Sequence, residues 1–198
     1  MIDEKNYSLK HHNTFGVDAL CARYIEYESV EELQQFLRQR PADIPFFPIG
    51  QGSNLLFTKD YEGIILHSNI KGITLMASND DSVLIEAGSG EVWDDFVSYC
   101  VDHGYYGLEN LSLIPGEVGA SAVQNIGAYG VEAKDLIEAV AAIDVEHNRM
   151  VILDKKQCRY AYRSSRFKTD WKGKYIITHV LYRLNRTFKP NLEYGALK

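Results

Sequence analysis

Two glycine-rich segments contain the residue types that could bind an anionic group. Residues 113–130 contain four glycines, several alanines and little charge, and residues 48–57 carry Gly50 and Gly52 between two apolar runs. Glycine has no Cβ, so the backbone there can approach a ligand closely and present its N–H groups to an anion. Either segment alone also fits a buried glycine-rich turn. The two segments together predict a cradle for one diphosphate.

Several larger side chains accompany these glycines. Ser53 and Asn54 could donate hydrogen bonds beside the glycine N–H groups, although an ordinary Asx turn is the alternative. Tyr129 is the one large side chain in a stretch of small residues, where a buried aromatic ring is the alternative. Arg163 follows two tyrosines and precedes two serines. Taken alone, this arginine is a surface cation.

The glycine spacing argues against a Rossmann dinucleotide site. Residues 88–93 follow a strand-like run and open a helical pattern, but Trp93 stands where the fingerprint needs its third glycine. The pair Gly50 and Gly52 fails in the same way at Leu55. We therefore predict that Trp93 belongs to the core.

Five short motifs, read together, resemble the UDP-N-acetylenolpyruvoylglucosamine reductase family of flavoenzymes. The motifs are residues 50–54, 108–111, 114–116, 124–130 and 162–168, and the resemblance extends in the family's order from residues 13–16 to 194–195. It implies an α+β protein with the two-subdomain FAD-binding fold of the vanillyl-alcohol-oxidase (PCMH) type. Two small subdomains would enclose the diphosphate of the cofactor.

The resemblance also implies a reaction. Non-covalently bound FAD takes hydride from NADPH and reduces UDP-N-acetylglucosamine enolpyruvate to UDP-N-acetylmuramate, a step of peptidoglycan precursor synthesis. Arg163 is the implied catalytic residue, because a guanidinium suits the carboxylate on which charge accumulates when hydride enters the β-carbon. The implied substrate contacts are Tyr129, Arg163 and Tyr194.

The cofactor contacts implied by the resemblance come from both glycine segments. They are Ile49, Gly50, Gln51, Gly52, Ser53, Asn54, Leu55, Ile114, Pro115, Gly116, Gly119, Ala120, Ser121, Gln124, Asn125, Gly127, Ala128, Tyr129 and Gly130.

The family pattern suggests a division of the chain. We expect residues 1–186 to form the FAD-binding domain, with subdomains at about 1–72 and 73–186, and residues 187–198 to begin a truncated substrate-binding domain. The family's proton-donating serine and a late glutamate would lie beyond residue 198, so the chain alone is expected to be inactive. A non-catalytic flavin- or nucleotide-binding module stays open as an alternative. An oxidase of the same fold with a histidine-linked flavin is disfavoured, because neither glycine segment contains histidine.

Local patterns predict the elements that position these residues. A capping box at Ser29 and Glu32 begins a helix that ends at Pro41, and an apolar stripe predicts a second helix from Val92 to Gly104. Asp154 begins one helical turn. Strands are expected at residues 46–49, 63–66, 73–76 and 83–87, in a hairpin of 136–145 with 150–153, and at a sheet edge over 175–184.

Composition limits the classes of partner. The net charge of −6 and the absence of a basic block argue against a nucleic-acid surface. The first twenty residues contain no long apolar run, so neither a signal peptide nor a membrane span is expected, and the chain is interpreted as cytoplasmic. Cys21, Cys100 and Cys158 are too widely spaced for a zinc site or a disulfide framework, and we predict buried thiols and no metal.

Overall fold

The structure of the chain, a computed structural model, describes residues 1–192, 194 and 195. Its first part is a four-stranded sheet in the order β1-β2-β4-β3, in which β1 is antiparallel to β2 while β2 and β3 both run parallel to β4. The strands are β1 (Ile2–Ser8), β2 (Leu20–Tyr27), β3 (Phe46–Ile49) and β4 (Tyr61–Ser68), with a 3₁₀ turn η1 (Lys10–His12) between β1 and β2. The polar start of the chain gave no signal for β1.

Helix α1 (Val30–Gln39) connects β2 to β3. Ser29 caps it as predicted, because its hydroxyl accepts a hydrogen bond from the Glu32 N–H at 3.2 Å. The second half of the predicted capping box is displaced by one residue: the Glu32 carboxylate accepts from the Glu28 N–H at 2.8 Å. Leu33 and Phe36 are buried on the face toward the sheet.

A five-stranded antiparallel sheet forms the second part, in the order β10-β9-β11-β6-β5. Its strands are β5 (Ile73–Ser78), β6 (Ser82–Gly88), β9 (Ile137–Asp144), β10 (Arg149–Asp154) and β11 (Tyr175–Asn185). The predicted edge position of residues 175–184 is wrong, because β11 lies in the centre between β9 and β6. Its alternation of buried Tyr182 and exposed Arg183 reflects one covered face, not a free edge.

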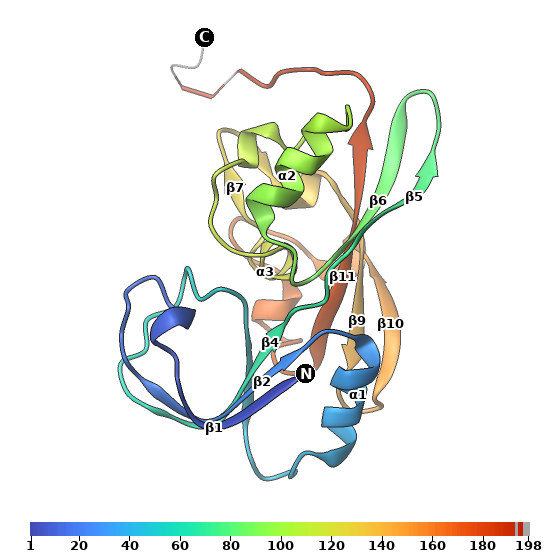
Figure 1. Cartoon of the computed structure of the whole chain (residues 1–198). Helices are drawn as coiled ribbons and strands as arrows, with labels where there is room; N and C mark the ends of the chain where they lie inside the picture. The colour runs from blue at the N-terminus through green and yellow to red at the C-terminus, as the bar shows by residue number, and fades with distance from the viewer. Residues whose placement is uncertain (193, 196–198) are drawn as a thin grey trace.

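Short helices cover that face (Figure 1). They are α2 (Trp93–Asp102), α3 (Val118–Gln124) and α4 (Lys155–Cys158), with 3₁₀ turns η2 (Glu109–Leu111), η3 (Ala133–Asp135) and η4 (Arg166–Lys168) and the small hairpin β7 (Gly127–Ala128) and β8 (Val131–Glu132). The predicted stripe of α2 is confirmed, except that Val101 is 38% exposed at its last turn. None of the helices in the part of the chain that is described is long and apolar enough to cross a bilayer.

The segment 113–130 has more regular structure than its composition suggests. It contains α3 and β7, the first strand of the hairpin β7–β8, because small residues let the chain pack directly on the second sheet. The Gly119 N–H donates to the Ser89 carbonyl at 2.9 Å, and the Ser121 and Tyr182 hydroxyls are 2.8 Å apart in the interior. This packing fixes the backbone that forms one wall of the site.

Two of the three buried clusters among the described residues hold these layers together. The larger lies between the second sheet, α2 and α3, and includes Trp93, Phe96 and Tyr182, so Trp93 is a core residue as predicted. The other joins α1 and the first sheet to Ile143 and Ile176 of the second sheet, so the two sheets share apolar contacts. The three cysteines are free and buried.

The end of the chain adds no further element to these layers. Residues 187–198 were expected to begin a substrate-binding domain. They form neither helix nor strand over 187–192, 194 and 195, and positions 193 and 196–198 lie outside the described residues.

Candidate functional site

The two glycine segments meet. The loop after β3 lies against the stretch that leads into α3, and two side-chain hydrogen bonds join them. Ser53 Oγ donates to the Pro115 carbonyl at 3.2 Å, and Asn54 Nδ2 donates to Gln124 Oε1 at 2.8 Å. These pairs are 62 and 70 residues apart in sequence, so tertiary packing brings the loops together.

A cavity of about 570 Å³ opens between these loops. This volume falls within the range of small-molecule and cofactor sites, about 300 to 1,000 Å³. Thirteen of the predicted cofactor residues line it. They are Ile49, Gly50, Gln51, Gly52, Ser53, Asn54, Leu55, Pro115, Gly116, Gly119, Ala120, Ser121 and Gln124.

Six predicted cofactor residues lie outside this lining: Ile114, Asn125, Gly127, Ala128, Tyr129 and Gly130. Ile114 and Ala128 pack on the larger core. Asn125 is fully buried in a left-handed conformation at the end of α3. Its amide donates to the Ala161 carbonyl at 2.8 Å and accepts from the Lys134 N–H at 2.9 Å. In this structure the Asn125 side chain therefore binds the protein's own backbone.

Close packing explains the two glycines of the first loop. Gly52 has φ +73°, and a Cβ built on it would lie 1.9 Å from the His12 carbonyl oxygen. At Gly50 a Cβ would lie 2.9 Å from Glu117 Oε2. Gly52 thus lets the loop pack closely on η1, and Gly50 lets it pack closely on Glu117 in the opposite wall of the cavity.

Several lining residues were not among the predicted contacts. Four aromatic residues and two lysines also contribute to the lining: Tyr27, Phe46, Phe47, Tyr175, Lys168 and Lys172. Lys168 belongs to the motif at 162–168, which is the one sequence signal that could have indicated it. The others come from strands and connecting segments that look like scaffold in the sequence.

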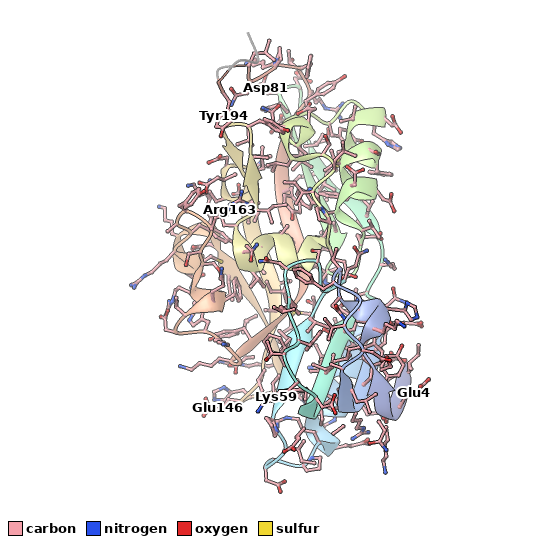
Figure 2. The ribbon with its side chains drawn as sticks, turned by 90° about the vertical axis from the view of Figure 1, so that its left-hand side faces the viewer. Glu4, Lys59, Asp81, Glu146, Arg163 and Tyr194 are labelled. Carbon is pink, nitrogen blue, oxygen red and sulfur yellow. The ribbon has the colours of Figure 1, made fainter. Side chains whose placement is uncertain are left out.

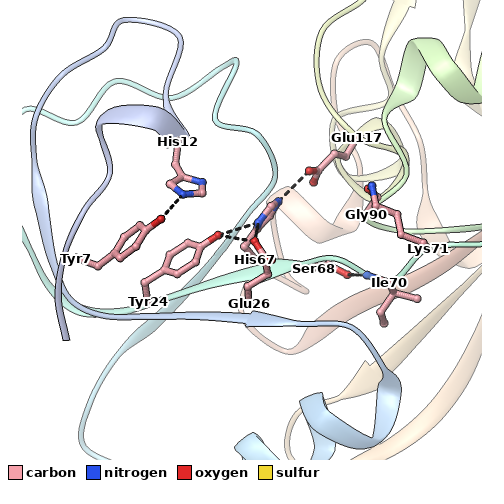
Figure 3. A network of polar contacts seen from close by, with 10 residues as sticks. All are labelled: Tyr7, His12, Tyr24, Glu26, His67, Ser68, Ile70, Lys71, Gly90 and Glu117. Atoms are coloured by element: carbon pink, nitrogen blue, oxygen red, sulfur yellow. Dashed lines mark hydrogen bonds and ion pairs between the residues drawn. The ribbon is translucent and has the colours of Figure 1, made fainter. Parts of the chain in front are cut away.

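A charged network lies beside the cavity (Figure 3). His67 on β4 lies between two carboxylates, with Nδ1 2.9 Å from Glu26 Oε2 and Nε2 2.8 Å from Glu117 Oε1. Burial favours the neutral ring, but the hydrogen bonds and charges of Glu117 and Glu26 outweigh it and raise the pKa of His67 above its ordinary value of 6.5. Glu117 also lines the cavity.

Arg163 lies apart from this cavity, at the tip of a tight turn. The backbone N–H groups and carbonyls of Ala161 and Ser164 are hydrogen-bonded to each other in both directions at 3.0 Å, and Arg163 between them has φ +53°. Its Nη2 donates to the Gly127 carbonyl at 2.5 Å. Among residues 1–192, 194 and 195, no carboxylate forms an ion pair with it. Arg163 is exposed, and the other N–H groups of its guanidinium can bind an anion.

Tyr129 lies at the tip of the hairpin that Arg163 contacts. Tyr129 and Gly130 have φ values of +47° and +78°, which makes the connection between β7 and β8 a type I′ turn. The Tyr129 ring is 52% exposed and meets Tyr194 edge to face, with ring centroids 6.1 Å apart. Figure 2 shows Tyr194 toward one end of the molecule and Arg163 nearer its middle. The predicted substrate residues thus surround the hairpin β7–β8, outside the cavity.

Known proteins with a similar sequence support the assignment of the cavity. A family model described as FAD binding domain matches residues 21–152. The UDP-N-acetylenolpyruvoylglucosamine reductase of Bacteroides fragilis is 51% identical over 195 residues, covering 98% of this chain and 58% of the relative. The enzyme of that name from Neisseria gonorrhoeae is 47% identical over 192 residues, covering 94% and 54%. The chain thus spans somewhat more than half of these curated relatives.

Solved structures show the same fold. The UDP-N-acetylenolpyruvylglucosamine reductase (MurB) of Thermus caldophilus superposes with a TM-score of 0.77 at 24% identity, covering 96% of this chain and 64% of that one. For p-cresol methylhydroxylase the TM-score is 0.59 at 13% identity, with 84% and 36% covered. The predicted α+β, two-subdomain FAD-binding fold is confirmed.

Proposed function

The chain belongs to the family of FAD-binding domains, and we infer from this and from its cavity that it is the flavin-binding part of a UDP-N-acetylenolpyruvoylglucosamine reductase. The observation that carries the proposal is the meeting of both glycine segments around one cavity of about 570 Å³. A dinucleotide needs an elongated, largely apolar site with a few fixed polar groups. The two loops and the aromatic rings of β3 supply such walls.

The residues that line the cavity fit FAD. Gly50, Gly52 and Gly116 carry no side chain where the two loops face each other, so backbone groups can approach a diphosphate. Lys168 and Lys172 supply the positive charge in the lining. Bound there, FAD would accept hydride from NADPH and pass it to the substrate. We propose non-covalent binding, because the cavity lining contains no histidine or cysteine.

The proposed substrate is UDP-N-acetylglucosamine enolpyruvate, which becomes UDP-N-acetylmuramate in peptidoglycan precursor synthesis in the cytoplasm. Arg163 would hold the enolpyruvyl carboxylate and stabilise the charge that develops on it. A guanidinium on a left-handed turn, without an ion-pair partner among the described residues, supports this role, because such conformations concentrate at functional sites. Tyr129 and Tyr194 would contact the rest of the substrate from beside the hairpin.

The extent of the match to the relatives bears on catalysis. The chain spans 58% of the Bacteroides fragilis reductase. We propose that residues 1–186 are the flavin domain, with subdomains at about 1–72 and 73–186, and that residues 187–198 begin a substrate-binding domain. A serine proton donor outside this sequence is part of the same proposal. The chain alone would then bind FAD without turnover.

A cavity-filling variant tests the flavin site. Ala120 is exposed in the cavity wall, so Ala120→Trp should block FAD without disturbing the core. Ala42→Trp adds the same bulk at an exposed position outside the lining and serves as the control. Quenching of flavin fluorescence measures binding. Equal FAD affinity in the two variants would show that the flavin lies elsewhere.

Catalysis is tested by NADPH oxidation that depends on the enolpyruvyl substrate. We expect none with residues 1–198 and turnover with a version extended by the downstream sequence. A flavin-binding module without catalysis would bind FAD in both forms and reduce substrate in neither. Release of the flavin on denaturation would distinguish non-covalent binding from the tethered flavin of an oxidase.

A further inference from the structure

A triad of charged side chains connects the two walls of the cavity. Glu26 extends from β2, His67 from β4 and Glu117 from the residue before α3, so the triad crosses from the first sheet to the second part of the molecule (Figure 3). The side chains are 17%, 13% and 6% exposed, respectively. Solvent and salt screen such buried charges only weakly, so these charges affect the electrostatic energy of a ligand in the cavity.

The hydrogen bonds favour a charged His67. Each ring nitrogen lies within 2.9 Å of a carboxylate oxygen, and a carboxylate can only accept. A neutral imidazole has one nitrogen without hydrogen, and that nitrogen would face an oxygen lone pair. The doubly protonated ring satisfies both contacts. The Tyr24 hydroxyl lies 2.9 Å from His67 Nδ1 and donates to Glu26 Oε2 at 3.0 Å, so its oxygen can accept from a protonated Nδ1.

The other titratable groups around the triad do not supply the positive charge beside Glu117. Burial, reinforced by the charge of His67, lowers the pKa of His12, whose ring centroid is 5.8 Å from that of His67. Burial raises the pKa values of Tyr7 and Tyr24, so both hydroxyls stay protonated. The lysines of the lining, Lys168 and Lys172, come from η4 and the turn before β11. His67 is therefore the cation that faces Glu117 directly.

Because Glu117 lies next to the first glycine loop, the charge of His67 affects the binding of a diphosphate there. Its Oε2 lies 2.9 Å from the position that a Cβ on Gly50 would occupy, so the carboxylate touches the loop assigned to the diphosphate. With His67 protonated, the triad carries one net negative charge; with His67 neutral, it carries two. An unbalanced carboxylate in this wall disfavours a bound diphosphate.

We propose that His67 neutralises Glu117 in the cavity wall, and that binding of the FAD diphosphate is thereby coupled to the protonation of His67. This inference rests on the proposed flavin site. His67 and Glu117 are positioning residues: they tune the charge of the wall that faces the diphosphate. Flavin affinity should fall as pH rises through the titration of His67, and FAD binding should take up protons in that range.

Calorimetry on the unaltered chain tests the coupling without any mutation. FAD is titrated into the protein at pH 6.5 and at about pH 9, in two buffers that differ in ionisation enthalpy. We expect affinity about tenfold weaker at the higher pH, the order of effect for one unit charge near a partly buried anion. The dependence of the heat on the buffer should report proton uptake. Equal affinities at both pH values and no uptake would overturn the proposal.

Three variants separate charge from structure. His67→Gln leaves Glu117 unbalanced and should weaken FAD binding about tenfold at pH 6.5. The double variant with Glu117→Gln should regain most of that loss, and Glu117→Gln alone should bind FAD at about pH 9 more tightly than the unaltered chain. His11→Gln changes an exposed histidine that makes none of the triad's hydrogen bonds described above, and it is the matched control. A different result would contradict the proposal: Glu117→Gln weakens FAD binding as much as His67→Gln does, and the double variant binds more weakly still. The contact between His67 and Glu117 would then serve only to hold the structure together.

Nitrogen chemical shifts of the His67 ring give a readout that does not need flavin. A doubly protonated ring at pH 6.5 in the flavin-free chain supports the proposal, and a neutral tautomer there contradicts it. Failure of the unaltered chain to bind FAD at either pH would contradict the proposed flavin site instead. The ring shifts would still decide the charge of His67.

Discussion

Replacing Gly52 by alanine tests how the first glycine loop is held. The new Cβ would lie 1.9 Å from the His12 carbonyl oxygen and 2.7 Å from its carbon, whereas ordinary contact begins at 3.4 Å. Both atoms are backbone, so no flexible side chain can move away. Either the loop at residues 50–54 or the segment with η1 must shift, and the cavity wall shifts with the loop.

The expected cost has two parts. Alanine in a left-handed conformation costs about 1 to 2 kcal/mol. Relief of the overlap with His12 costs about 1 to 3 kcal/mol more, as for other overpacked sites. Gly52→Ala should thus lower the free energy of unfolding by about 2 to 5 kcal/mol, a large part of the roughly 5 to 15 kcal/mol that stabilises a typical protein.

Gly16→Ala provides a matched control. Gly16 also has a left-handed backbone, with φ +63°, but a Cβ there meets no atom within 4 Å. The effect of alanine on the unfolded chain is the same in both variants and cancels in the comparison. Urea denaturation should therefore show Gly52→Ala to be less stable than Gly16→Ala by about 1 to 3 kcal/mol, and FAD affinity should fall only in the Gly52 variant. Equal stabilities would refute the packing of Gly52 on His12.

Three other changes test separate features of the site. In the complete reductase, Arg163→Ala should slow oxidation of reduced flavin by the enolpyruvyl substrate about a hundredfold to a thousandfold while reduction by NADPH changes less; normal oxidation in stopped-flow traces would reject the role of Arg163. The raised pKa of His67 means that its stabilising contribution is complete below its ordinary value of 6.5 and is lost as pH rises through the folded value. Urea denaturation should therefore show a decline in stability above pH 6.5 that is smaller in His67→Gln, and an unchanged slope would argue against the charge on this ring. The hydrogen bond between Asn54 and Gln124 should give a coupling energy of about 0.5 to 1 kcal/mol in a double-mutant cycle of alanine variants, and strict additivity would indicate that the loops are joined by other contacts.

Local sequence signals predicted the elements whose causes are local. Ser29 marks the start of α1, the stripe of α2 predicts its buried face, and Asp154 begins α4 with a complete capping box. Each of these features depends on interactions between residues only a few positions apart, so a short stretch of sequence is enough to predict it. The two glycine segments were evident for a similar reason, because the absence of side chains is itself a feature of the sequence.

Tertiary structure decided which residues meet. The central position of β11 follows from its pairing with β9 and β6, and the helix α3 follows from packing of small residues on the second sheet. Neither the strand pairing nor the packing can be recognised from a short stretch of sequence. The prediction made Tyr129 a cofactor and substrate contact and Arg163 a catalytic and substrate residue. The structure puts both on tight turns at the hairpin β7–β8, outside the cavity lining.

The glycine and histidine contacts illustrate the same limit. The sequence by itself determined that residues 50 and 52 would have no side chain, that Glu117 would interrupt an uncharged segment and that His67 would follow an apolar run. Only the fold decided that Gly52 packs on His12 and that His67 meets Glu117, 50 residues further along the chain. Hydrogen bonding and close packing act over a few ångströms, so these partners exist only after strand pairing has brought distant segments together.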